Sequence, residues 1–265
     1  MASYETEVLD FVERETVVPS SLLGISGMRG VGKTTLLRFV RDSYAHGSFF
    51  SYVFFLGAGP GCTVKSLQHA LSVNLLTTLP DVPAISTCLK GKPFLLLLDD
   101  VRERLDLAAL GLPTPLGRRQ KVIFTTRNHQ ICADMGCQSI QMECLSEDDA
   151  WNLFKDKVGQ ENNIDAHPHI KHLAKKCFKY LFCSISSSAD IAKYFKQMVA
   201  ECCGLPSALC ALGRAMSTKT DVKEWRYAYD MLKRKRSPVS EIQEIDDEGH
   251  SHLYHLEEKL QDLFF

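Results

Sequence analysis

Apolar runs of strand length alternate with longer, periodically apolar segments over about the first 160 residues of the chain. The strand-like runs are Leu22–Ser26, Tyr52–Leu56, Phe94–Leu98, Lys121–Thr125 and Ser139–Met142. Between them, Lys33–Tyr44 and Val64–Leu76 have the apolar spacing of helices. Because continuous apolar strands that alternate with helices are typical of parallel sheets, the pattern predicts an α/β fold with helices on both faces of the sheet.

The pattern becomes helical after this region. Ser146 precedes Asp149 by three residues, as in a helix N-cap, and further helices are predicted over Ser207–Met216 and Asp221–Arg234. Residues 237–249 are acidic and predict an exposed connection, and residues 252–265 predict the start of another helix. The predicted organisation is a linker over 1–21, a nucleotide-binding domain over 22–145, a small all-helical lobe over 146–236 and a truncated second lobe over 237–265.

The turn after the first strand carries a phosphate-binding sequence. Residues 27–35 read Gly-Met-Arg-Gly-Val-Gly-Lys-Thr-Thr, which matches the Walker A pattern G-x-x-x-x-G-K-[ST]. Glycines let successive backbone N–H groups face phosphate oxygens, and the following helix directs its positive end at the same anion. Lys33 is expected to neutralise phosphate charge, and the Thr34 hydroxyl to bind Mg²⁺. The predicted nucleotide-binding residues of this loop are Gly27, Gly30, Val31, Gly32, Lys33, Thr34 and Thr35.

Two later strands end in charged residues that suit the same site. Asp99 and Asp100 follow four leucines, as in a Walker B sequence, so Asp99 is the predicted Mg²⁺ ligand and Asp100 the predicted general base. Arg127 follows the next strand and is predicted to contact a γ-phosphate. The alternatives are a strand that ends in an ordinary polar turn and an arginine that is simply solvated.

These motifs occur in one order with Leu-Ser-Glu-Asp-Asp-Ala-Trp-Asn-Leu-Phe and, from residue 204, Gly-Leu-Pro-Ser-Ala-Leu. From about Leu22 to Arg236 the series resembles the NB-ARC domain of plant nucleotide-binding leucine-rich-repeat disease-resistance proteins. The resemblance implies a P-loop NTPase fold and an ADP/ATP switch that is at most a slow ATPase. It also implies that Leu205 and Pro206 lie at the adenine of ADP or ATP, and that other protein domains or receptor subunits are partners.

The chain departs from that family in several places. Arg102 stands where the family has Trp after Asp-Asp-Val, and no Met-His-Asp block, preceding signalling domain or leucine-rich repeat is expected in this sequence. The helix that leads into Gly-Leu-Pro is interrupted by a 22-residue insert, Cys177–Met198. One hypothesis rebuilds this helix from Ala189 onward and extrudes Lys171–Ser188 as a turn or loop. The alternative is that the insert disorders the lobe.

Composition excludes several other classes of protein. The formal net charge of −1 gives no overall basic field for nucleic acid, and the longest apolar run is far shorter than the roughly 20 residues of a membrane span. The N-terminus has no apolar signal region, and the ten cysteines include no Cys-x-x-Cys pair, so a reduced cytoplasmic protein is expected. Three functions are considered: a defence-receptor switch, a nucleotide-binding decoy or interaction module that cannot switch, and an unrelated P-loop kinase.

Overall fold

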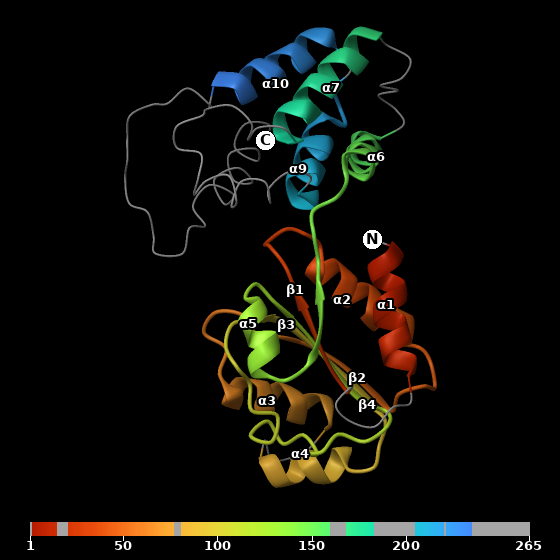
Figure 1. The fold of residues 1–265 in the computed structure, drawn as a ribbon, viewed down its shortest axis with the longest axis vertical. Helices are drawn as coiled ribbons and strands as arrows, with labels where there is room; N and C mark the ends of the chain where they lie inside the picture. Colours follow the sequence, from red (N-terminus) through yellow and green to blue (C-terminus); the bar gives the residue numbers. More distant parts are fainter. Residues whose placement is uncertain are drawn as a thin grey trace. The chain divides into compact units, whose positions relative to one another are not determined.

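The computed structural model describes residues 2–14, 21–76, 81–159, 168–182, 205–219 and 221–234 (Figure 1). The chain divides into two compact units, Met1–Met142 and Glu143–Phe265, whereas the predicted boundary lay after residue 145. None of the helices in the described ranges is long and apolar enough to cross a membrane.

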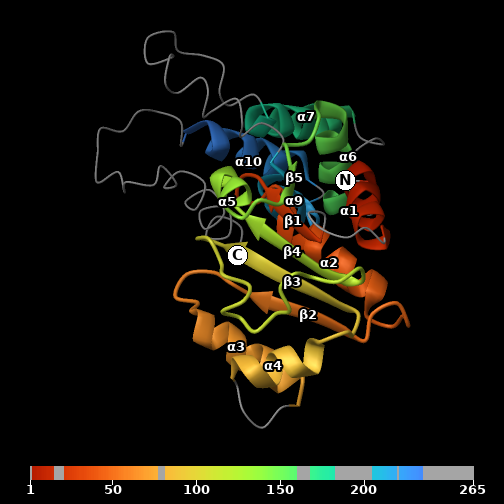
Figure 2. The same cartoon turned by 60° about the horizontal axis from the view of Figure 1, so that its bottom comes forward.

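The first unit is built on a five-stranded sheet in which all neighbouring strands run parallel. The strand order is β2–β3–β4–β1–β5, and Figure 2 shows the strands side by side. Their bounds are Leu22–Ser26 (β1), Tyr52–Gly57 (β2), Phe94–Val101 (β3), Gln120–Thr126 (β4) and Gln138–Gln141 (β5). The α/β prediction with a parallel sheet is therefore confirmed.

Helices cover both faces of this sheet. Helices α1 (Ala2–Glu13) and α2 (Lys33–Tyr44) lie on one face. Helices α3 (Val64–Asn74), α4 (Val82–Leu89) and α5 (His129–Asp134) contribute apolar side chains to the core on the other. Alternate strand residues point to opposite faces, so a strand such as β3, buried at every position from Phe94 to Leu98, packs against both layers.

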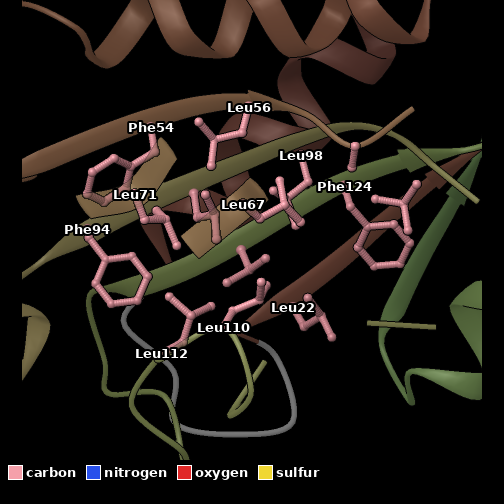
Figure 3. Packing of buried hydrophobic residues seen from close by; sticks show 14 of the residues in the cluster. Leu22, Phe54, Leu56, Leu67, Leu71, Phe94, Leu98, Leu110, Leu112 and Phe124 are labelled. Atoms are coloured by element: carbon pink, nitrogen blue, oxygen red, sulfur yellow. The ribbon is translucent and has the colours of Figure 1, made fainter. Parts of the chain in front are cut away.

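Figure 3 shows part of the core between the sheet and α3. Phe94 and Leu98 of β3, Phe124 of β4 and the α3 residues Leu67 and Leu71 belong to one cluster, and all five side chains are almost fully buried. Burial of large apolar side chains is worth about 1.5–3 kcal/mol for each, which makes this cluster a main source of stability for the sheet. A rigid sheet in turn fixes the strand ends that carry the predicted site.

Helix α1 occupies residues that were predicted to be an N-terminal linker. Val8, Phe11 and Val12 recur at helical spacing and are almost fully buried. The Phe11 ring lies 4.8 Å from the Nζ atom of Lys121, a lysine of β4 whose side chain is only 1% exposed. Burial, with a further contribution from the nearby Arg14 charge, lowers the pKa of Lys121. The linker prediction for residues 2–13 was therefore wrong. The apolar stripe spans only about one helical turn, which is too short to identify a helix from the sequence.

The second unit is helical in its described residues. It contains α6 (Glu147–Val158), α7 (Pro168–Phe182), α9 (Pro206–Met216) and α10 (Val222–Arg234). Ser146 caps α6, since its side chain accepts a hydrogen bond from the backbone of Asp149. Trp225 is fully buried at the centre of the unit, and its ring meets that of Phe154 edge to face with 6.5 Å between the centroids.

The start of the insert differs from the prediction. Residues 168–182 form the helix α7, so the expected extrusion of Lys171–Ser188 as a loop is wrong for Lys171–Phe182. The physical reason is an apolar stripe at helical spacing, which is buried against the other helices: Ile170, Leu173, Ala174 and Cys177. The helix proposed from Ala189 to the Gly-Leu-Pro sequence, and the segments predicted after residue 236, lie outside the described residues.

Candidate functional site

The phosphate-binding loop joins β1 to α2. Gly30 and Gly32 have positive φ angles of 78° and 109°, which residues with a side chain rarely adopt. Gly27 has φ 152°, and a Cβ added to it would lie 2.6 Å from the backbone oxygen of Met142. The N-terminus of α2 has no side-chain cap, so its first backbone N–H groups can serve an anion. Three glycines thus shape a backbone cradle that fits phosphate.

Lys33 lies folded into this loop and is only 8% exposed. Its ammonium donates hydrogen bonds to the carbonyl oxygens of Gly27, at 2.6 Å, and Met28, at 2.7 Å. The pKa of Lys33 is lowered to about 8, chiefly by burial and next by the Arg127 charge, while the Asp100 and Asp99 carboxylates oppose the shift. The charged ammonium is therefore incompletely compensated, which favours the arrival of a phosphate.

Asp99, near the end of β3, links the start of helix α2 to strand β4. Its Oδ1 atom accepts a hydrogen bond from the Thr34 hydroxyl at 3.0 Å and another from the Thr125 hydroxyl at 2.6 Å. The Thr125 oxygen also accepts a bond from the backbone N–H of Asp100 at 2.8 Å. A hydroxyl and a carboxylate oxygen in contact beside a phosphate loop are the donor types that Mg²⁺ prefers, so these residues fit a metal-bound nucleotide.

Asp100 points elsewhere because the strand is irregular at this position. The register of β3 against β4 shifts between Leu98 and Val101, and Asp100 has a positive φ of 64°. Its carboxylate forms an ion pair with Arg127, at 3.2 Å from Nε to Oδ1, and another with Arg102, at 3.0 Å. Asp99 and Asp100 are consecutive in sequence yet have different partners as a result of this bulge.

Positive charge therefore gathers on one side of the loop. Burial lowers the pKa of Arg127; Asp100 opposes this shift, whereas the nearby cations Arg102 and Arg29 reinforce it. Arg127 is 23% exposed and Arg102 is 36% exposed, so both guanidinium groups remain open to a ligand from solvent. Such a cluster suits the charge of a polyphosphate.

The predicted adenine-side residues belong to the second unit. Leu205 is 4% exposed and forms the N-cap of α9, with Pro206 at the first helical position, where a residue without an N–H is tolerated. The predicted metal and phosphate residues all lie in the first unit, where they are close together. The contact of Leu205 and Pro206 with a nucleotide stays a prediction.

Two features of the site were not assigned a role from the sequence. Thr125 bonds both to Asp99 and to the backbone of Asp100, although its only sequence signal is its place in the Thr-Thr-Arg strand end. Arg102 was noted as a departure from the family pattern, but its pairing with Asp100 depends on the β3 bulge. Sequence spacing does not encode either contact.

A chain with this parallel sheet, Walker A loop and paired aspartates is a P-loop nucleotide-binding protein. Residues 6–164 match the NB-ARC domain, and the chain belongs to that family. Nucleotide binding follows from this membership.

Among curated proteins, a probable disease resistance protein of Arabidopsis thaliana is 35% identical over 231 residues, which cover 83% of this chain and 23% of that protein. The Arabidopsis thaliana disease resistance protein UNI is 33% identical over 84% of this chain and 24% of its own length. The chain thus spans about a quarter of the length of these relatives.

Among solved structures, Drosophila ORC bound to DNA aligns with a TM-score of 0.50 at 15% identity, covering 92% of this chain and 69% of that chain. At this identity the likeness concerns the fold alone. It agrees with the parallel sheet of the first unit.

Proposed function

We propose that this chain is the ADP/ATP-binding switch module of a plant defence protein. The proposal rests on one arrangement: Thr34, Asp99 and Thr125 form a hydrogen-bonded chain beside the loop, while Asp100 holds Arg127. The hydroxyl and carboxylate oxygens suit Mg²⁺, and the Arg127 guanidinium suits a γ-phosphate. Because only ATP has a γ-phosphate, ATP and ADP would be bound differently. The names of the curated relatives, which are disease resistance proteins, support a role in defence.

Lys33 would exchange its two carbonyl acceptors for phosphate oxygens when a nucleotide enters the loop. The N–H groups at the start of α2 would bind the same phosphates, and Thr34 and Asp99 would hold the metal. Mg²⁺ would neutralise phosphate charge there. Leu205 and Pro206 would contact the adenine, as the family resemblance implies.

Asp100 would first position Arg127 and act as a general base only after a guanidinium has left it. In the present arrangement both of its carboxylate oxygens accept hydrogen bonds or ion pairs from arginine. The arginine groups then occupy the oxygens that would have to accept a proton from the attacking water, so hydrolysis would be slow. Arg127 would move to the γ-phosphate in the ATP-bound state, and its return to Asp100 would mark the ADP-bound state.

Other domains of the same receptor, or other receptor subunits, would be the partners that respond to this change. A cytoplasmic location is supported by the cysteines of the described residues, which are free thiols: Cys62, Cys88, Cys132, Cys137, Cys144, Cys177 and Cys210.

The test is to purify the chain and identify the nucleotide that accompanies it by chromatography. ADP or ATP is the expected result, and a guanine nucleotide or an empty protein that binds neither adenine nucleotide in calorimetry would contradict the proposal. Lys33→Ala should lose ADP binding because phosphate charge is left uncompensated. Equal affinity in the variant would show that the site is elsewhere.

The paired aspartates provide a sharper test of the mechanism. Asp99→Asn should weaken Mg²⁺-dependent binding, because it replaces the predicted ligand. Asp100→Asn should spare ADP binding and lower the rate of hydrolysis, because it removes the predicted base. Calorimetry with and without Mg²⁺, together with phosphate release, measures both effects. Identical losses of affinity in the two variants would remove this division of roles.

A further inference from the structure

Two thiols meet at the C-terminal end of α5. Gly136, with φ 59°, follows the helix and donates its N–H to the Ala133 carbonyl at 2.9 Å, while Cys137 donates its N–H to the Cys132 carbonyl at 3.2 Å. This pair of hydrogen bonds is a Schellman motif, in which the residue at each end of the longer bond packs against the other. Apolar side chains usually occupy these two positions, and here both are cysteine.

Strand β1 provides the surface on which both sulfurs rest. A Cβ built on Gly24 would lie 2.5 Å from Sγ of Cys132 and 3.1 Å from Sγ of Cys137. Both sulfurs therefore approach a single point, which the absence of a side chain at Gly24 leaves open. The Cys137 thiol also donates to the Cys132 carbonyl at 3.2 Å, so the turn and the thiols form one compact group.

The two thiols differ in access and in acidity. Cys132 is 1% exposed, whereas Cys137 is half-buried and open to solvent. A hydrogen bond with the Cys132 thiol lowers the pKa of Cys137, and the backbone N–H of Gly24 adds to this against the effect of burial. The same thiol–thiol bond and burial raise the pKa of Cys132. Cys137 is thus the more reactive sulfur and Cys132 the buried partner beside it.

The geometry points to Cys132 and Cys137 as a redox-active dithiol, a modification site that a hydroperoxide converts to an intramolecular disulfide. The Cys137 sulfur attacks hydrogen peroxide, which breaks the O–O bond and yields a sulfenic acid and one water. The Cys132 sulfur then attacks the Cys137 sulfur, forms the S–S bond and releases the sulfenic oxygen as a second water. In total, two thiols and one peroxide give one disulfide and two waters, and a thiol reductant reverses the change.

This inference is independent of the nucleotide chemistry, since neither cysteine belongs to the phosphate site. The short turn between the two residues keeps their backbones near each other, as a disulfide requires. Transient disulfides of this kind are the type expected in a reducing compartment.

The test treats the reduced chain with about one equivalent of hydrogen peroxide, blocks the remaining thiols with N-ethylmaleimide and measures the mass. Endoprotease cleavage before Asp134 cuts between the two cysteines, so peptides that stay joined until reduction identify the disulfide. The expected result is this linked pair as the main oxidation product, restored to two thiols by dithiothreitol. This measurement needs no variant and is unaffected by changes in folding.

Two variants separate the roles. Cys132→Ser should stop the reaction at a sulfenic acid on Cys137, which dimedone traps, because the resolving thiol is absent. The matched control is Cys62→Ser, which removes a half-buried thiol of another turn and should leave the disulfide yield unchanged. The inference is overturned if both cysteines are fully blocked by maleimide after peroxide treatment. Pairing of Cys137 with Cys144, or a stable sulfenic acid on Cys137 in the unsubstituted chain, would overturn it as well.

Discussion

The depressed pKa of Lys33 makes nucleotide binding depend on pH in a definite direction. In the free protein this pKa is lowered to about 8, mainly by burial. A bound phosphate would supply opposite charge and raise it again, so binding at or above pH 8 takes up a proton. If the bound form stays protonated throughout, affinity follows the protonated fraction of the free form. That fraction falls from about nine-tenths at pH 7 to about one-tenth at pH 9.

We therefore expect ADP to bind about tenfold more weakly at pH 9 than at pH 7, a loss of about 1.4 kcal/mol. Titration calorimetry in buffers with different ionisation enthalpies should detect an uptake of about half a proton at pH 8. The nucleotide phosphate itself titrates near pH 6, below this window. The control is Lys33→Arg, whose side chain stays charged and should give a flat profile even if its affinity is lower.

The same pKa sets how the contribution of Lys33 to stability depends on pH. Between pH 8 and the ordinary lysine value of 10.5 the unfolded chain holds a proton on Lys33 that the folded protein has lost. Unfolding then takes up a proton, so the contribution of Lys33 to stability rises with pH across this window and is lost as pH falls through 8.

Both expectations depend on the lowered pKa of Lys33. An ADP affinity that is constant from pH 7 to 9, with no proton uptake, would refute the lowered pKa.

Other substitutions give further tests. Gly27→Ala would place a Cβ 2.6 Å from a backbone oxygen, so it should cost about 2 kcal/mol in urea unfolding and abolish ADP binding. The control is Gly47→Ala, whose nearest contact would be 3.9 Å away and which should change neither stability nor ADP binding. Arg127→Gln should lower the affinity for ATP more than that for ADP. Its control is Arg102→Gln, because Arg102 is the more exposed of the two arginines that pair with Asp100. This variant should change stability by less than about 1 kcal/mol and keep the preference between ATP and ADP. Trp225→Ala should destabilise the second unit by about 3–5 kcal/mol in urea unfolding. Trp225→Phe should cost less, because it keeps one aromatic ring and loses only part of the buried volume together with the hydrogen bond to the Lys219 carbonyl. A Phe variant as unstable as the Ala variant would count against a packing role.

Much of the first unit follows from local sequence. The helix over Lys33–Tyr44 was predicted with its observed bounds, because a glycine turn marks its start and its apolar positions are regular. Strand β3 was recognised from its leucines but extends to Val101, since the bulge lets the chain pair again after two polar residues. Helices α4 and α5 were missed because eight and six residues are too few for a clear helical period.

The site divides in the same way. The Walker sequences predicted the neighbouring positions of Thr34 and Asp99, whose side chains do meet. They did not predict that Asp100 turns away to Arg102 and Arg127, because this depends on a positive φ angle and a register shift that arise from strand pairing. A β-bulge forms only when the strands pair, and a single sequence gives no direct sign of where a bulge will occur. The contacts of Asp100 therefore could not be predicted.

Helix α1 covers the buried ammonium of Lys121 with the ring of Phe11. Detachment of this helix would expose three apolar side chains, but it would also return the ammonium to water, and the hydration gained would offset part of the loss. The sheet beneath keeps its strand pairing in that event, because α1 supplies no strand to it. We therefore expect the backbone amides of α1 to exchange with deuterium well before those of β4, so that the first helix separates from the fold as a discrete, reversible local opening.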